Sequence, residues 1–187
     1  MIEKWSYRIA AHIHQRVPES SIQVLQFSIL ALTNMLITFA ILGAVGIALQ
    51  HLPLLWFSIA FIILRFLTGG RHLHSHWACT AFTCLFFTVL SYIEIPVAFW
   101  WVVILISCTW ILRYSPVLED HQPRKTESVY RKLKVMAVLF VWLCIPLAYY
   151  IHPSFLTGVM FQSFLLTPIG VFIINRLNQR LKGGDAW

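Results

Sequence analysis

The stretch FSILALTNMLITFAILGAVGIAL, residues 27–49, carries no charged side chain. A helix needs about 20 consecutive apolar residues to cross the hydrocarbon core of a bilayer, so this stretch is long enough to span a membrane. It is too long for the core of a cleaved signal peptide, and the residues before it do not form a short basic segment. We therefore predict that it stays in the protein as a membrane anchor.

Five further apolar stretches follow along the chain. They cover residues 53–67, 77–93, 95–112, 135–151 and 154–174. Of the 187 residues, 59% are hydrophobic and 11% are charged, and the mean hydropathy is +0.75. Because a soluble domain carries about 25% charged residues, this composition excludes an ordinary soluble globule. The sequence predicts an all-α membrane protein with about six transmembrane helices, folded as a single integral membrane domain over residues 1–187.

Lysine and arginine fall in every second connection between these stretches. They precede the first stretch and follow the second, fourth and sixth, whereas the turns near His51, Glu94 and His152 contain neither. Cytoplasmic loops are enriched in Lys and Arg, so we expect both termini, including the tail 175–187, on the cytoplasmic side. The net charge of +7 then belongs to loops at the anionic surface of a lipid bilayer, and we expect no nucleic-acid partner.

Residues 1–24, before the first span, have a different pattern. Apolar residues recur every three or four positions, and basic residues fall on another face. This is the pattern of an N-terminal amphipathic helix that lies in the membrane interface. An ordinary helix packed on the membrane domain explains it equally well.

Between the second and third stretches lies RFLTGGRHLHSHWAC, residues 65–79. One interpretation is a zinc site, because His72, His76 and Cys79 are spaced to share one face of a helix, and imidazole and thiolate both bind zinc. Against zinc, the only carboxylate within 20 residues of this segment is Glu94, which the charge pattern places at the other membrane face. A wet structural loop is a second interpretation.

A third interpretation is a cysteine nucleophile with a histidine base. On a straight helix His72 would lie about 10.5 Å from Cys79, too far for proton transfer, and His76 is the nearer partner. Gly69 and Gly70 permit a sharp turn, so we expect a bent or re-entrant loop that would let His72 reach Cys79. Basic residues nearby favour a thiolate, the form of cysteine that attacks a carbonyl.

The segment RFLTGGRHLHSHWAC resembles the signature of the accessory gene regulator protein B (AgrB) family, bacterial membrane endopeptidases that process a quorum-sensing precursor peptide. The residues that fall on the family pattern are Arg65, Gly69, Gly70, His72 and Cys79. The resemblance implies that His72 and Cys79 are catalytic and that Arg65 and the glycines support them. His74 and His76 add imidazoles beyond the one histidine that the family requires, so His76 is a helper or a bystander.

The connection at residues 113–134 separates the first four spans (27–112) from the last two (135–174). Its prolines and basic tail resemble the family's segment between the fourth and fifth spans. The resemblance implies that basic residues here hold the acidic C-terminal tail of a short precursor peptide like AgrD. The candidate substrate-binding residues are Arg124, Lys125, Arg131, Lys132 and Lys134.

The resemblance implies a cysteine endopeptidase of the bacterial cell membrane, with its motif on the cytoplasmic side and no cofactor. The Cys79 thiolate would release the tail and pass the acyl group to a cysteine or serine of the peptide, which gives a cyclic thiolactone or lactone. The family suggests a homodimer. Two alternatives stay open: a zinc-dependent membrane hydrolase using His72, His76 and Cys79, and a small non-enzymatic transporter subunit, which the lack of a membrane-embedded acid disfavours.

Overall fold

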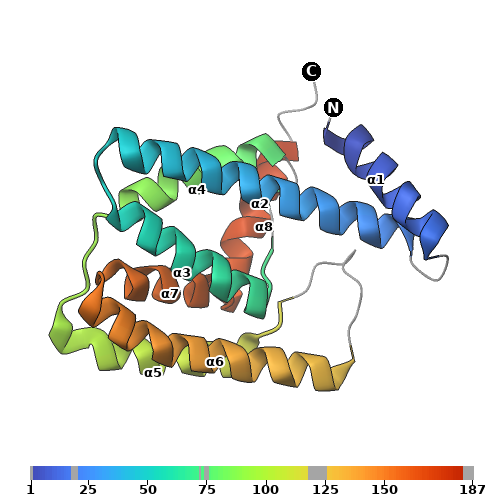
Figure 1. The fold of residues 1–187 in the computed structure, drawn as a ribbon. Coiled ribbons are helices and arrows are strands. Elements are labelled where there is room, and N and C mark those ends of the chain that lie inside the picture. The colour runs from blue at the N-terminus through green and yellow to red at the C-terminus, as the bar shows by residue number, and fades with distance from the viewer. Residues whose placement is uncertain (1, 18–20, 72, 74–75, 118–125, 183–187) are drawn as a thin grey trace.

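The computed structural model describes residues 2–17, 21–71, 73, 76–117 and 126–182, and at residues 2, 3, 27, 76, 77, 181 and 182 it describes the backbone alone. Within these ranges the chain is helical apart from its connections (Figure 1), which confirms the all-α prediction. The helices are α1 (Ile2–Arg16), α2 (Ile22–Ala48), α3 (Pro53–Thr68), α4 (His76–Leu90), the 3₁₀ turn η1 (Val97–Phe99), α5 (Trp100–Tyr114), α6 (Glu127–Tyr150), α7 (Ser154–Leu165) and α8 (Pro168–Lys182).

Helices α2 to α7 lie lengthwise beside one another and run in alternating directions (Figure 1). One end of this bundle therefore collects the connections α3–α4, α5–α6 and α7–α8, and we call it the motif end because residues 65–71 and 76–79 lie there. The other end, called the far end, collects α2–α3, α4–α5 and α6–α7. The predicted N-terminal helix is confirmed as α1, which packs against α2. Its place in a membrane interface stays a prediction.

In the described part of the chain, three helical segments are long and apolar enough to cross a membrane by length and composition: α2, η1 with α5 (Val97–Tyr114), and α6. A fourth exists if α7 and α8 count as one span, although that pair is bent by 75°. Helix α3 and the part Ala78–Leu90 of α4 are shorter apolar helices. The structure therefore gives three or four candidate spans, and six crossings with cytoplasmic termini stay a prediction.

The last predicted stretch, residues 154–174, is not one continuous helix. Helix α7 ends at Leu165 and α8 begins at Pro168. Proline has no N–H to continue a helix but is well suited to the first position of a new one. The Thr167 hydroxyl donates to the Phe164 carbonyl oxygen (2.7 Å) and accepts from the Gly170 N–H (3.2 Å). These bonds satisfy both helix ends at the break, which the hydropathy pattern could not show.

The core of the bundle lies between α3 and α7. Along α7 most side chains from Ser154 to Val159 are fully or almost fully buried, as are Leu54 and Leu64 of α3. A Cβ atom at Gly158 would overlap the Phe57 carbonyl oxygen of α3, so glycine lets the two helices approach to backbone contact. This close approach brings the next turn of α7 against the end of α3, where the motif begins.

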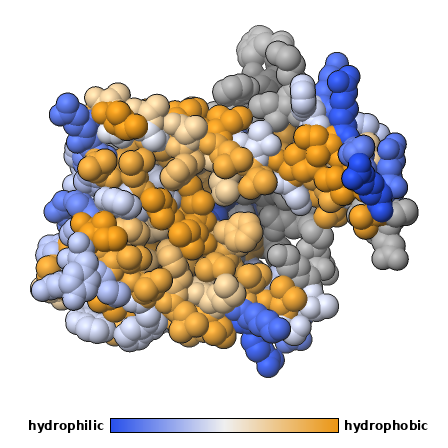
Figure 2. Space-filling view, in the orientation of Figure 1, coloured by the Kyte–Doolittle hydropathy of each residue, from blue (hydrophilic) through white to orange (hydrophobic). Residues whose placement is uncertain are grey.

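The outer surface of the bundle is apolar. Figure 2 shows a continuous apolar surface over the helical body, with hydrophilic residues toward its ends and along α1. Leucines that point outward include Leu32, Leu85, Leu105 and Leu139, each more than half exposed. Monomeric soluble proteins rarely expose apolar patches larger than a few hundred Å², so the surface agrees with helices that face lipid.

Candidate active site

A sharp glycine turn ends α3 and begins the motif loop. Gly69 has φ 73° and Gly70 has φ 150°, both in the region that favours glycine. A Cβ atom at Gly69 would lie 2.5 Å from the Val117 carbonyl oxygen, and one at Gly70 would lie 2.6 Å from Arg65 Nη1. The predicted bend is confirmed: α3 ends at Thr68 instead of continuing into α4.

Hydrogen bonds hold this turn on both sides. The Gly70 N–H donates to the Val117 carbonyl oxygen (3.1 Å), and the Val117 N–H donates to the Thr68 carbonyl oxygen (3.2 Å). From α7, Gln162 Nε2 donates to the Gly69 carbonyl oxygen (3.0 Å) and to Thr68 Oγ1 (3.1 Å). The peptide group between the two glycines is therefore bonded at its N–H and at its C=O.

Arg65 ties the loop after the glycines back to α3. Its Nη2 donates to the Arg71 carbonyl oxygen (2.5 Å), and its guanidinium lies 5.8 Å from the centre of the Phe61 ring. Arg71 in turn donates from Nη1 to Asn175 Oδ1 of α8 (3.0 Å). The half-buried guanidinium of Arg65 fills the space beside Gly70, which explains why that position has no side chain.

Cys79 lies in the first turn of α4 and is half-buried. The next residue, Thr80, is buried, and its Oγ1 donates to Asn34 Oδ1 of α2 (3.1 Å) and lies 3.3 Å from Thr38 Oγ1. This polar contact between apolar helices fixes the rotation of α4 about its axis, and so the direction of its Cys79 side. Sequence reasoning missed Asn34, although a carboxamide inside the first apolar run was a signal.

The structure describes no side chain for the candidate base histidines, His72 and His76. His72 lies outside the described residues, and His76 begins α4 but its side chain is not described. The distance from either imidazole to Cys79, and the zinc alternative built on the same residues, therefore stay predictions. Among side chains that the structure does describe, no group of three or more His, Cys, Asp or Glu could hold a metal ion.

The basic connection after α5 begins beside the glycine turn, through the pairing of Gly69 with Val117. Lys134 Nζ donates to the Leu112 carbonyl oxygen (2.9 Å), so this predicted substrate-binding residue caps the last turn of α5. Arg131 and Lys132 are exposed on the first turns of α6. Arg124 and Lys125 lie outside the described part of the chain.

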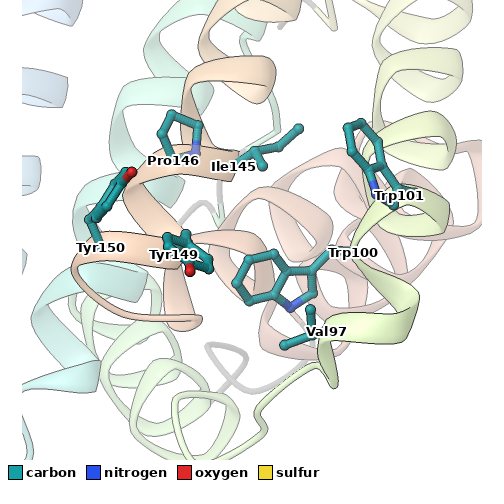
Figure 3. Close-up of a pocket in the computed structure, with 7 residues that line it drawn as sticks. All are labelled: Val97, Trp100, Trp101, Ile145, Pro146, Tyr149 and Tyr150. Atoms are coloured by element: carbon teal, nitrogen blue, oxygen red, sulfur yellow. The ribbon is translucent and has the colours of Figure 1, made fainter.

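An apolar pocket of roughly 320 Å³ lies at the far end, away from the motif. Trp100 and Trp101 of α5 and Tyr149 and Tyr150 of α6 line it, together with Pro146 (Figure 3). Tryptophan and tyrosine gather where a membrane meets water. The pocket contains none of the predicted site residues, so it is not the candidate active site.

The described residues define a class of protein: a helical bundle with several helices apolar enough to span a membrane, and with a cysteine and a glycine turn at one end. The profile of the family described as accessory gene regulator B matches residues 2–166. The chain therefore belongs to the AgrB family, whose members take part in processing the accessory gene regulator peptide.

Two curated relatives align with nearly the whole chain. The chain is 32% identical over 192 aligned positions to a protein of Halalkalibacterium halodurans named for its likeness to AgrB, covering 100% of this chain and 98% of that protein. A Clostridium beijerinckii protein of the same name is 24% identical over 186 positions, which cover 94% of this chain and 90% of the relative. No solved structure matches the chain.

Proposed function

We propose that this protein is a membrane cysteine endopeptidase that removes the C-terminal tail of a short quorum-sensing precursor peptide and cyclises the remainder. The observation that carries the proposal is the pairing of the glycine turn with Val117. It brings the start of the basic connection against the glycine turn that begins the motif loop, so this connection and the first turn of α4, which carries Cys79, belong to the same end of the bundle. Membership in the AgrB family supports the same reading.

In the first chemical step the Cys79 thiolate attacks the carbonyl carbon of the scissile peptide bond. Protonated His72 gives its proton to the leaving nitrogen, and the tail departs with a new amino terminus. The core of the peptide stays on Cys79 as a thioester. Cys79 suits this role because the first turn of a helix carries the positive end of its dipole, which stabilises an anion there.

In the second step a thiol or hydroxyl of the peptide core attacks the thioester. His72 accepts its proton, the Cys79 thiolate is expelled, and a cyclic thiolactone or lactone forms. Exchange of one thioester for another changes the free energy little, so water must be kept away from the intermediate. The half-buried position of Cys79 in an apolar bundle meets this need.

Exposed basic residues bind the acidic tail in this proposal. Arg131 and Lys132 present their charges outward from the first turns of α6, and Arg124 and Lys125 precede them in the chain. Lys134 contributes through structure, because it caps α5. We expect removal of the Arg131 and Lys132 charges to raise KM more than it lowers kcat, because they contact the tail and not the reacting bond.

We also propose six membrane crossings with both termini and the motif on the cytoplasmic side of the bacterial cell membrane. The alternating directions of α2 to α7 support this, since every Lys- and Arg-bearing connection then lies at the motif end. A membrane-impermeant thiol reagent applied outside the cell should label Gln50→Cys at the far end but not Ser128→Cys at the motif end. Labelling of both positions, or of Ser128→Cys alone, would contradict this topology.

Cleavage by single cysteine variants tests the proposed activity. Purified protein in liposomes is incubated with a short precursor peptide that has a cysteine or serine in its core and an acidic C-terminal tail, and the released tail is quantified. Cys79→Ala should lose cleavage completely. Cys84→Ala is the matched control, because Cys84 is half-buried on the same helix and should keep most of the activity. Full cleavage by the Cys79→Ala protein would overturn the proposal.

A further inference from the structure

Gln162 is the polar side chain of α7 that reaches the motif. Its side chain is fully buried, and its Nε2 donates both to the Gly69 carbonyl oxygen (3.0 Å) and to Thr68 Oγ1 (3.1 Å). Thr68 Oγ1 itself donates to the Leu64 carbonyl oxygen of α3 (2.8 Å). The carboxamide therefore bonds the last turn of α3 and the first residue of the glycine turn at once.

The Gly69 carbonyl is a group that needs such a donor, because its other contact is the Thr68 hydroxyl at 3.4 Å, which makes the shorter bond to the Leu64 carbonyl oxygen (2.8 Å). The Gly69 carbonyl follows the last residue of a helix, where carbonyl oxygens have no partner within the helix, and a polar group left unbonded in an apolar interior is costly. The Gly70 N–H on the other side of the same peptide bond is held by Val117. Gln162 completes the set, so the plane of this peptide group has one orientation.

One half of the carboxamide is bonded within the described part of the chain. Among the described residues Gln162 Oε1 has no hydrogen-bond partner, although the side chain has no exposed surface. A buried acceptor without a donor destabilises the fold, and a methionine would fill the same space without it. What glutamine offers here and methionine does not is the Nε2 donor to the end of α3 and to the glycine turn.

We infer that Gln162 is a positioning residue for the catalytic motif. Its carboxamide orients the Gly69–Gly70 peptide group, which sets the direction in which the chain leaves α3 toward His72. The inference rests on the proposed function, in which His72 activates Cys79. Gln162 touches neither the thiol nor the peptide substrate, and it acts through the turn.

The reactivity of the Cys79 thiol tests this without any peptide substrate. Full-length protein in detergent is treated with iodoacetamide at neutral pH, and mass spectrometry follows alkylation of Cys79 specifically. His72→Ala should slow this alkylation by roughly 10-fold, because an unassisted thiol is only a few per cent ionised at pH 7. Gln162→Met, which keeps the volume and loses the donor, should slow it by a similar factor.

The double variant separates positioning from packing. If Gln162 acts through His72, then Gln162→Met combined with His72→Ala is no slower than His72→Ala alone. Ser163→Ala is the matched control, since Ser163 is the adjacent fully buried residue and its hydroxyl also has no partner among the described residues. It should leave alkylation of Cys79 at the wild-type rate.

Each contrary result has a distinct meaning. Wild-type alkylation in Gln162→Met, beside slow alkylation in His72→Ala, would overturn the inference and leave the proposed function standing. Faster alkylation in Gln162→Met would also overturn it, because a role in packing alone would loosen the bundle and expose the thiol. If His72→Ala left the alkylation rate of Cys79 unchanged, His72 would not be the base. Both the proposed function and this inference would then be wrong.

Discussion

The two ends of the helical bundle are held together in different ways. At the motif end the α3–α4 connection is fixed by bonds to its main chain, from Val117 and from the buried Gln162. At the far end the connections meet through side chains and at one point through the main chain: His51 Nε2 lies 3.0 Å from Ser91 Oγ, Glu94 Oε1 lies 3.7 Å from His152 Nε2, and Thr157 Oγ1 of α7 donates to the Ile93 carbonyl oxygen (3.0 Å). The motif end therefore depends on the conformation of a glycine turn with positive φ, whereas the far end combines contacts of the buried Ser91 and Thr157 with the exposed Glu94.

This difference orders the expected effects of substitution. A glycine turn at positive φ, with the Val117 carbonyl oxygen as the nearest neighbour of Gly69, cannot relax when a side chain is added there. An exposed ion pair contributes little, because water and salt screen it. We therefore expect substitutions to lose less activity and stability as they move from the glycine turn to the far end.

The largest effect is expected for Gly69→Ala. The new Cβ would meet the Val117 carbonyl oxygen at 2.5 Å, and alanine at φ 73° adds strain. We expect a loss of stability of roughly 1–3 kcal/mol from the conformation alone, and tail cleavage below detection. Thermal unfolding in detergent measures the loss of stability, and the cleavage assay measures the loss of activity. Gly43→Ala is the control, since nothing lies within 4 Å of its added Cβ, and equal losses in both variants would refute the close contact.

A smaller effect is expected for Arg65→Lys. Lysine keeps the positive charge but lacks the planar guanidinium that lies over Phe61 and donates to the Arg71 carbonyl oxygen. We expect cleavage roughly 10-fold slower from the displaced loop, with KM nearly unchanged. A rate equal to the wild type would show that the planar shape of the guanidinium is not needed.

Thr80→Val should have a modest effect. Valine matches the shape of threonine but loses the bond to Asn34 that fixes the rotation of α4. Hydrogen bonds between side chains inside membrane proteins contribute about 0.6 kcal/mol on average, so we expect a small fall in stability and a several-fold slower alkylation of Cys79. Thr109→Val, which removes an exposed hydroxyl bonded within its own helix, is the comparison. If Thr109→Val slowed Cys79 alkylation as much, the contact with α2 would have no special role.

Glu94→Gln should have the smallest effect. The Glu94 side chain is 61% exposed, and its Oε1 lies 3.7 Å from His152 Nε2 at the far end of the bundle. Exposed pairs contribute about 0–1 kcal/mol, so stability should change little, and less still at high salt. Cleavage should equal that of the wild type. A loss of cleavage comparable to that of Arg65→Lys would mean that the two ends are coupled.

Local sequence rules predicted the parts of the fold that depend on local patterns. Apolar stretches predicted helices, and Gly69-Gly70 predicted the bend, because positive φ is a property of the residue itself. The break between α7 and α8 was missed because Thr167 and Pro168 interrupt a stretch that is apolar on both sides. Hydropathy averages over such a break, whereas helix caps depend on single hydrogen bonds.

Contacts between distant segments could not be predicted from the sequence. Gln162 lies 93 residues from Gly69 in the chain, and no periodicity relates Val117 to the motif. The role of Lys134 as a cap for α5 likewise depends on how α5 and α6 pack. A polar residue in an apolar stretch marks such a position, as Asn34 and Gln162 do, but only the packing of helices identifies its partner.

The most direct test of the account is to look for the acyl-enzyme. The protein is incubated with a precursor peptide whose core nucleophile is replaced by alanine, so that cyclisation is blocked, and is then digested and examined by mass spectrometry. The account predicts the peptide core attached to Cys79 through a bond that neutral hydroxylamine cleaves. Release of the tail with no adduct on Cys79, together with tail release by the Cys79→Ala protein, would contradict it.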